Sequence, residues 1–312
     1  MIRLLSPVDL PQLISIQSML AYDEAHTSDN LGGPQHIATA MGVFLGQWVS
    51  LNLRQKQQSW VCTGENGLQG FVSVRSHNES FSWEIDHLLL KRNDSNSICS
   101  DLLHAVVSDL RRSAAHRIFL RLAADSPLIE PAQRVGFTPY LRECLYQLNT
   151  MWTAHKTGTK SWQNIRPLNK KDEYHLFELY NVAFPATVRC IEGVTFTEWR
   201  EVRGSLACPQ WKSQFVAEDN GNIIAQCNIA SRGNIGQFEV IIHPDADVEE
   251  IIGYAGAYLS NYPTIRCLVP QHDSILASSL AGHGFVPVAE YDALANLSAI
   301  RVQEEALLPI RI

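Results

Sequence analysis

The order of hydrophobic and polar residues in the N-terminal half predicts short strands alternating with amphipathic helices. Residues 59–63 and 68–76 read as the two strands of a hairpin, because the Asn66-Gly67 pair between them supplies the positive φ angles of a tight turn. Residues 81–90 and 116–123 read as further strands. Between these two strands, apolar residues recur at the spacing of one helix face: Ile98, Leu102, Leu103, Val106, Val107 and Leu110.

The same order of elements is predicted in both halves of the chain. In the N-terminal half, the hairpin is preceded by a strand over residues 2–5, a helix that starts at Ser6 or Asp9 and ends near Leu20, and a helix over 36–55. The predicted C-terminal elements are a strand over 165–168, helices over 173–183 and 197–203, a hairpin across Asn220-Gly221-Asn222, a strand over 236–242, a helix over 248–259 and a strand over 264–269.

One sequence signature closes each half. Asp125-Ser126, nine residues and Gly136-Phe137-Thr138-Pro139 recur as Asp273-Ser274, nine residues and Gly284-Phe285-Val286-Pro287. In each copy the Asp is expected to cap a helix, and the Gly is expected to end it in a left-handed conformation. The Pro is expected in an edge strand, because it has no N–H for a ladder hydrogen bond.

Residues 150–160 are polar, show no periodicity and read as a linker. A chain of 312 residues also exceeds the usual length of one domain. We therefore predict two consecutive α/β domains built on one plan, residues 1–155 and 156–312.

The composition argues against several classes of protein. No stretch approaches the ~20 consecutive apolar residues of a membrane span, and the N-terminus lacks the apolar run of a secretory signal. A net charge of −7 argues against a nucleic-acid surface, which needs clustered Lys and Arg. The seven cysteines are far apart and form no C-x-x-C pair, so we expect buried free thiols in a reducing cytoplasm.

The repeated order of elements, ending each time in a helix closed by Gly-Phe and a final pair of strands, resembles the GNAT family of acyl-CoA N-acyltransferases. The resemblance covers nearly all the chain and implies two GNAT-like domains, each with a mixed α/β sheet. It also implies transfer of an acyl group from acetyl-CoA to an amine of a small molecule or peptide. In that family the fourth strand splays from the fifth, the pantetheine arm lies in the gap, and the pyrophosphate sits at the start of the next helix.

The resemblance points to a donor site in the first domain. The residues implied are Leu88, Leu90, Lys91, Arg92, Ser95, Ser97, Ile98, Cys99 and Asp125. Ser97 and Cys99 stand where the family's phosphate loop has glycines. Residues 243–250 of the second domain are glycine-free and acidic, so that domain is expected to be a degenerate copy that shapes the acceptor cleft.

Candidate bases are carboxylates on the strands that border the donor gap, since an amine must lose a proton to attack. Glu84 and Asp86 are two residues apart, and we expect them on one strand face, opposite Ile85 and His87. Glu239 lies on the comparable strand of the second domain.

The family's thiolate-protonating tyrosine is replaced by Ala132 and Leu280, and Tyr140 or Tyr146 could take its place. The acidic residues Asp245, Asp247, Glu249 and Glu250 lack the glycine and ligand spacing of a calcium loop, so no metal is expected.

Two other functions are compatible with the same sequence. The missing glycines and tyrosine favour a non-catalytic protein that keeps the fold for ligand binding or interaction. Tandem aminoacyl-transferases that take their donor from tRNA share the arrangement, but this chain has no basic stripe. The acceptor pocket is expected to come from residues 22–55, whose sequence names neither the acceptor nor the oligomeric state.

Overall fold

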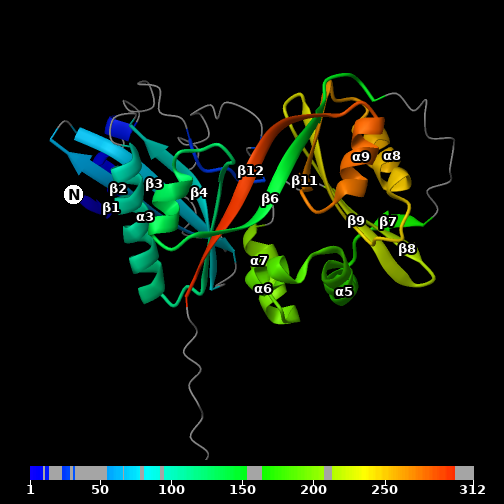
Figure 1. Ribbon diagram of the computed structural model, residues 1–312, viewed down its shortest axis with the longest axis horizontal. Coiled ribbons are helices and arrows are strands. Elements are labelled where there is room, and N and C mark those ends of the chain that lie inside the picture. The colour runs from blue at the N-terminus through cyan, green and yellow to red at the C-terminus, as the bar shows by residue number, and fades with distance from the viewer. Residues whose placement is uncertain are drawn as a thin grey trace, which may run out of the picture.

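The computed structural model describes residues 1–9, 11–13, 23–28, 31, 55–65, 67–77, 81–91, 95–152, 164–206 and 213–298. Within these residues the strands form one twelve-stranded sheet in the order β1-β2-β3-β4-β5-β12-β6-β11-β10-β9-β8-β7. Figure 1 shows β6 and β12 crossing the centre of the molecule, with one half of the chain on either side. The mixed α/β fold predicted from the sequence is confirmed.

The N-terminal half has the predicted order of elements. Its strands and helices are β1 (Ile2–Leu4), η1 (Pro7–Asp9), β2 (Gln55–Gly64), β3 (Gly67–His77), β4 (Ser82–Leu90), α3 (Ser95–Arg112), β5 (Arg117–Ala123), α4 (Ile129–Arg134) and β6 (Thr138–Leu148). All six residues of the predicted helical stripe are buried on α3. The helix predicted over 36–55 is wrong at its last residue, because Gln55 begins β2, and the rest of it lies outside the described residues.

The C-terminal half repeats this order. Its elements are β7 (Ile165–Pro167), η3 (Lys170–Asp172), α5 (Glu173–Ala183), α6 (Ala186–Glu192), α7 (Phe196–Leu206), β8 (Ser213–Asp219), β9 (Asn222–Arg232), β10 (Ile235–Ile242), α8 (Val248–Tyr258), β11 (Thr264–Pro270), α9 (Ser274–Gly282) and β12 (Val286–Leu297). Of the described elements in this half, two were not predicted: the short 3-10 turn η3, and α6, which begins directly after Pro185, a residue common at helix starts.

The two halves exchange their last strands. β12, at the end of the C-terminal half, pairs with β5 of the N-terminal half and also with β6. In turn β6 pairs with β11 of the C-terminal half. The sheet is therefore continuous across the two repeats, while the predicted boundary near residue 155 falls in a segment that lies outside the described residues.

The two prolines of the closing signature lie on strands inside this continuous sheet, but each occupies a part of its strand that is paired on one side only. Pro139 pairs with β12, whereas β6 pairs with β11 only from Glu143 onward. Pro287 pairs with β6, whereas β12 pairs with β5 only from Tyr291 onward. Among the described residues each Pro thus has the local edge position that its missing N–H requires, although neither strand is an edge strand of the sheet.

The glycines of the signature behave as predicted, with φ of +94° at Gly136 and +89° at Gly284. Asp273 caps α9 by accepting from the Leu276 N–H at 3.0 Å. The same prediction is wrong for Asp125, because turns precede α4 and the helix begins only at Ile129, after Leu128.

The helices lie in two layers. α3 and α4 pack on one face of the sheet around a core that includes Trp83, Leu102 and Leu122, and the alternation along β12 and β6 places α8 and α9 on the same face. The opposite face carries α5, α6 and α7. α7 belongs to the C-terminal half but lies against β3 and β4 of the N-terminal half.

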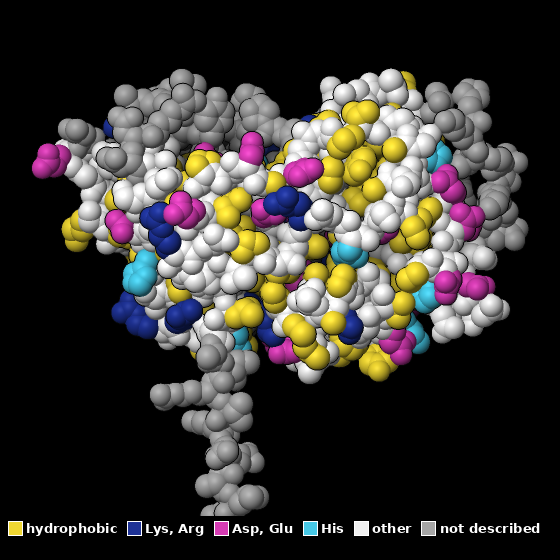
Figure 2. All heavy atoms as spheres, viewed as in Figure 1, with side chains coloured by type: hydrophobic (Ala, Val, Ile, Leu, Met, Phe, Trp, Pro, Cys, Tyr) yellow, Lys and Arg dark blue, Asp and Glu magenta, His cyan; other side chains and the backbone are white. Residues whose placement is uncertain are grey.

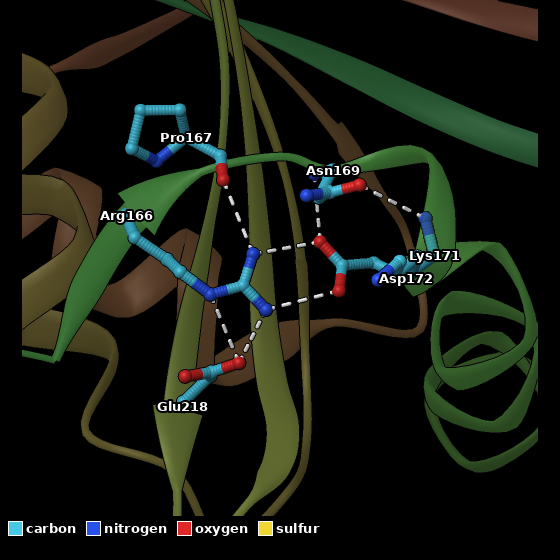
Figure 3. Close-up of polar contacts among 6 residues, drawn as sticks. All are labelled: Arg166, Pro167, Asn169, Lys171, Asp172 and Glu218. Atoms are coloured by element: carbon cyan, nitrogen blue, oxygen red, sulfur yellow. Dashed lines mark hydrogen bonds and ion pairs between the residues drawn. The ribbon is translucent and has the colours of Figure 1, made fainter.

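A second repeated motif ties the first strand of each half to the turn that follows. Arg166 forms a two-pronged ion pair with Asp172, with Nη–Oδ distances of 2.7 and 2.9 Å, while the Asn169 N–H donates to the same carboxylate (Figure 3). In the N-terminal half Arg3 pairs with Asp9 at 2.6 and 2.7 Å, and Ser6 takes the place of Asn169. The shared spacing is further evidence that the halves repeat one plan.

The surface and the thiols agree only partly with expectation. On the face shown in Figure 2, Lys and Arg are scattered among Asp and Glu over the described residues. No described helix is long and apolar enough to span a membrane. The described cysteines are free thiols, and Cys62, Cys99, Cys227 and Cys267 are buried as predicted, whereas Cys190 is exposed.

Candidate functional site

Two pairs of parallel strands separate partway along their length. β4 and β5 pair only from Ser82 to Glu84, and beyond that point the strands diverge. β10 and β11 pair from Ile235 to Phe238 and then diverge in the same way. The helix that connects each pair, α3 or α8, starts beyond the end of the diverging first strand. Both halves thus show the splay that the family resemblance implies.

The N-terminal gap is filled by the chain itself. The segment of residues 23–28 lies between the two separated strands, since the Glu24 N–H donates to the Leu88 oxygen on β4 and the His26 N–H donates to the Arg121 oxygen on β5, both at 2.9 Å. Ala25, between these two residues, is completely buried in the core. The segment therefore contacts both walls of the gap.

A β-bulge on β4 corrects the predicted orientation of His87. The pairing with β3 shifts between Ser73–His87 and Val74–Ile85, so that Asp86 is the extra residue. Glu84 and Asp86 share a face as predicted, but the bulge adds His87 to that face instead of placing it opposite. Bulges that re-aim side chains are frequent beside functional sites.

The two predicted first-domain bases are both engaged. Glu84 is buried and bound by Arg75, whose Nε and Nη2 lie 2.9 and 2.7 Å from Oε2. Asp86 is also buried, and its Oδ2 accepts from Gln57 at 3.3 Å, while its Oδ1 has no hydrogen-bond partner among the described residues. Of this pair, Asp86 has the freer carboxylate.

His87 is held in its charged form. Burial lowers its pKa, but the carboxylates of Asp86 and Asp23 act more strongly and raise the pKa to about 9. Asp23 forms an ion pair with His87 Nδ1 and accepts from the Leu88 N–H at 2.8 Å. The bulge thus connects β4 to the segment in the gap.

The predicted donor-binding residues lie along the end of β4 and the start of α3. Leu88, Leu90, Ile98 and Cys99 are buried in the core, so only their backbone groups are available to a ligand. The backbone N–H and oxygen of Leu88 already bond to Asp23 and Glu24.

The polar members of the predicted donor set are more accessible. Lys91 and Ser95 are partly exposed and Ser97 is exposed. Asp125 is exposed in a turn, and Arg92 lies outside the described residues.

The C-terminal gap differs in what enters it and in the state of its candidate carboxylate. Among the described residues no backbone hydrogen bond enters it. Glu239 is the first residue of β10 beyond the last residue paired with β11, and its carboxylate makes no hydrogen bond or ion pair with the described part of the chain. It faces away from α8, because its neighbours Phe238 and Val240 pack in the core beneath that helix.

Polar side chains surround Glu239 on its sheet face. Asn228 is its cross-strand partner and is buried. The Oδ1 of Asn228 accepts from Gln214 and Gln226, at 3.2 and 3.0 Å. The Glu239 carboxylate thus lies beside a preorganised row of amides.

A carboxylate of the protein itself, that of Asp247, occupies the start of α8. Asp247 caps the helix by accepting from the Glu249 N–H at 3.1 Å. Glu249 turns away to His283 Nε2, 2.7 Å distant, and to Ser279, and Asp245 extends into solvent. Of the acidic residues in this turn, Asp247 is the one whose carboxylate takes a hydrogen bond from the helix start, where a phosphate would bind.

Tyr140, one of the two tyrosines considered as a replacement acid, has another role. Tyr140 donates to Glu192 Oε1 at 3.1 Å, and Tyr180 donates to Oε2 at 2.9 Å. Burial raises the pKa of Glu192 and of both tyrosines. These side chains lock β6, α5 and α6 together instead of facing either gap.

Sequence reasoning missed the residues that fill the N-terminal gap. Asp23 and His26 belong to a region read only as the acceptor pocket, and His87 is predicted on the strand face opposite Glu84 and Asp86. Nothing in their spacing signals the contact, because Asp23 and His87 are 64 positions apart.

Comparison with known proteins agrees with this geometry. No protein-family model and no curated protein matches the sequence. Among the solved structures that match over nearly the whole chain, two have a TM-score of 0.56. A tandem GNAT protein from the clavulanic acid biosynthesis pathway, 10% identical, covers 96% of this chain and is itself covered to 98%. A GCN5-related N-acetyltransferase from Sphaerobacter thermophilus, 15% identical, matches over 95% of each chain. The chain has the tandem GNAT fold.

Proposed function

We propose that this protein is an N-acyltransferase that moves an acyl group from acetyl-CoA to an amine of a small molecule or peptide. The observation that carries the proposal is the repeated divergence of two parallel strands joined by a helix, β4 and β5 with α3, and β10 and β11 with α8. The similarity to GNAT proteins over nearly the whole chain supports the same reaction.

The chemistry assigns one task to a carboxylate of the protein. Acetyl-CoA would supply the acyl group as a thioester. Glu239 would take the proton from the acceptor ammonium, directly or through a water, so that the nitrogen can form the new C–N bond while the C–S bond breaks. Its carboxylate, which has no hydrogen-bond or ion-pair partner among the described residues, lies where β10 and β11 begin to separate, and this supports the role.

In the N-terminal half the corresponding base would be Asp86, whose Oδ1 has no partner among the described side chains. Glu84 is less suited, because its ion pair with Arg75 stabilises the charged form and occupies the carboxylate. The donor in this half would lie along Leu88, Leu90 and Lys91 toward Ser97, once the gap is open.

The test is a calorimetric titration of the full chain with acetyl-CoA, followed by a thiol-release assay over a panel of primary amines. Micromolar binding and amine-dependent release of CoA are expected. Binding without turnover over the whole panel would contradict acyl transfer and favour a ligand-binding protein of the same fold. Absence of binding by the folded protein would contradict both.

A further inference from the structure

Residues 23–28 occupy the N-terminal gap in the manner of an added strand. Asp23 forms an antiparallel bridge with Leu89 of β4. The segment then bonds through Glu24 to β4 and through His26 to β5. A linear ligand whose amide groups entered this gap would compete for the same backbone positions.

Charge and burial hold the segment in addition to these backbone bonds. The carboxylate of Asp23 accepts from the Leu88 N–H and pairs with protonated His87. Ala25 has no exposed surface and belongs to the core that includes Leu88 and Leu122. The segment is thus packed as part of the fold.

The segment also reaches the C-terminal half. The His26 ring lies 4.8 Å from the ring of Tyr291 on β12. The oxygen of Ser28 accepts from Gln237 at 2.9 Å, and beyond the segment the oxygen of Leu31 accepts from Arg266 at 2.7 Å. Gln237 and Arg266 are a cross-strand pair at the base of the second gap. Any departure of the segment would therefore break contacts with both halves.

Glu24 adds a negative charge close to the phosphate end of the gap. Its charge contributes to the raised pKa of the Cys99 thiol, which burial raises most, to about 12. Cys99 lies in the first turns of α3, where the helix dipole would attract a phosphate.

We propose that residues 23–28 form an internal strand that closes the donor slot of the N-terminal half, so that acyl-CoA enters this slot only after the strand has left. The proposal rests on the proposed function, because it takes the gap for a donor slot. A slot that is open in only a fraction of molecules binds its ligand with an affinity reduced by that fraction.

The first test compares two buried aspartates of the same half. The side chains of Asp23 and Asp9 are both 4% exposed and both ion-paired. Of the two, only Asp23 binds β4, through His87 and the Leu88 N–H. In Asp23→Ala, the Glu24 and His26 amides should exchange hydrogen about tenfold faster, and acetyl-CoA should bind the N-terminal half about tenfold more tightly. Asp9→Ala should leave both quantities at the wild-type level.

The second test holds the segment in place with an engineered disulfide, called the lock below. Asp23 and Leu89 are bridge partners, and such antiparallel pairs lie within the span of a disulfide. In the double variant Asp23→Cys, Leu89→Cys, oxidation should remove any protection by acetyl-CoA of the amides at the end of β4 and the start of α3. Reduction should restore that protection.

The possible outcomes separate this proposal from the proposed function. Acetyl-CoA that protects β4 and α3 in the oxidised lock, or in wild-type protein whose Glu24 and His26 amides stay protected, would overturn the internal strand alone. An Asp23→Ala variant with fast exchange and unchanged affinity in the N-terminal half would do the same. If no folded variant binds acetyl-CoA, both proposals are overturned.

Discussion

The imidazole of His87 and the carboxylate of Asp23 form an ion pair that joins β4 to the segment lying between β4 and β5. The pair depends on the bulge at Asp86, which brings His87 to the face where Asp23 arrives. A single extra residue in one strand therefore determines which side chain holds the segment.

This pair predicts a pH dependence of stability. Asp86 and Asp23 raise the pKa of His87 to about 9 against the lowering by burial and by Arg75, whereas the unfolded chain has a value near 6.5. A group whose pKa is raised by folding contributes stability in full below its unfolded pKa and loses it as the pH rises through the folded pKa. The contribution, about 3 kcal/mol by the size of the shift, should be present at pH 6 and lost above about 9.

Denaturant unfolding at pH 6 and pH 10 measures this effect. Wild-type protein should lose more stability between the two pH values than His87→Gln does. His104→Gln, a change at an exposed histidine of α3, should follow the wild-type profile. Equal losses in wild type and His87→Gln would show that the pair contributes nothing at neutral pH.

The contact between Asp23 and His87 also marks the limit of what the sequence predicts. Nearly every described strand and helix follows from local periodicity and turn residues, as the stripe on α3 illustrates. At the bulge the alternation of polar and apolar residues breaks, since Asp86 and His87 are both polar, but this break alone does not indicate that His87 joins the face of Glu84. The strand exchange leaves no local sign, because Pro139 and Pro287 predict positions paired on one side only, which they have, without indicating which strand lies on the paired side.

The sequence identifies the candidate carboxylates, but it does not predict which of them are bound by neighbouring side chains. A two-residue spacing predicts that Glu84 and Asp86 share a face, which they do. Whether a carboxylate is free depends on its cross-strand neighbour, and here Arg75 lies opposite Glu84 while Asn228 lies opposite Glu239. The register of the strands therefore decides whether a carboxylate lies opposite an arginine, which pairs with it, or opposite an amide side chain.

The difference predicts unequal effects of three isosteric variants on acyl transfer. Glu239→Gln should lower kcat/KM by about 10²- to 10⁴-fold, the range for loss of a general base. Asp86→Asn and Glu84→Gln should change it only a few fold while the N-terminal gap stays filled. Steady-state kinetics with one accepted amine provide the measurement, and a large loss in Asp86→Asn alone would move the active centre to the N-terminal half.

The two tyrosines bound to Glu192 predict a coupled contribution to stability. Glu192→Ala would leave the hydroxyls of Tyr140 and Tyr180 buried without their acceptor, which should cost roughly 2 to 4 kcal/mol. Tyr140→Phe should cost less, because Tyr180 still donates to the carboxylate. A double-mutant cycle between Tyr140→Phe and Glu192→Ala, followed by chemical denaturation, measures the coupling energy, and strict additivity would contradict a shared network.

The segment after β6 packs on the C-terminal half through Trp152, which lies directly against Gly256 of α8. A Cβ atom added to Gly256 would lie 2.3 Å from the Trp152 ring. Trp152 also packs against the rings of His283 and Phe285, 5.0 and 6.4 Å away, so the indole has little room to retreat. Gly256 is thus required by packing, although a helix interior would otherwise favour alanine.

Gly256→Ala is therefore expected to destabilise the protein by about 1 to 3 kcal/mol, the usual cost of overpacking, in spite of the better helix propensity. Gly282→Ala is the matched control, since Gly282 also lies in a helix and a Cβ there meets nothing within 4 Å. It should be neutral or stabilising. Thermal unfolding of the two variants and of Gly256→Ala combined with Trp152→Ala gives the decisive comparison. Loss of the indole should relieve the clash, so the second change should cost less in the Gly256→Ala background than in wild type.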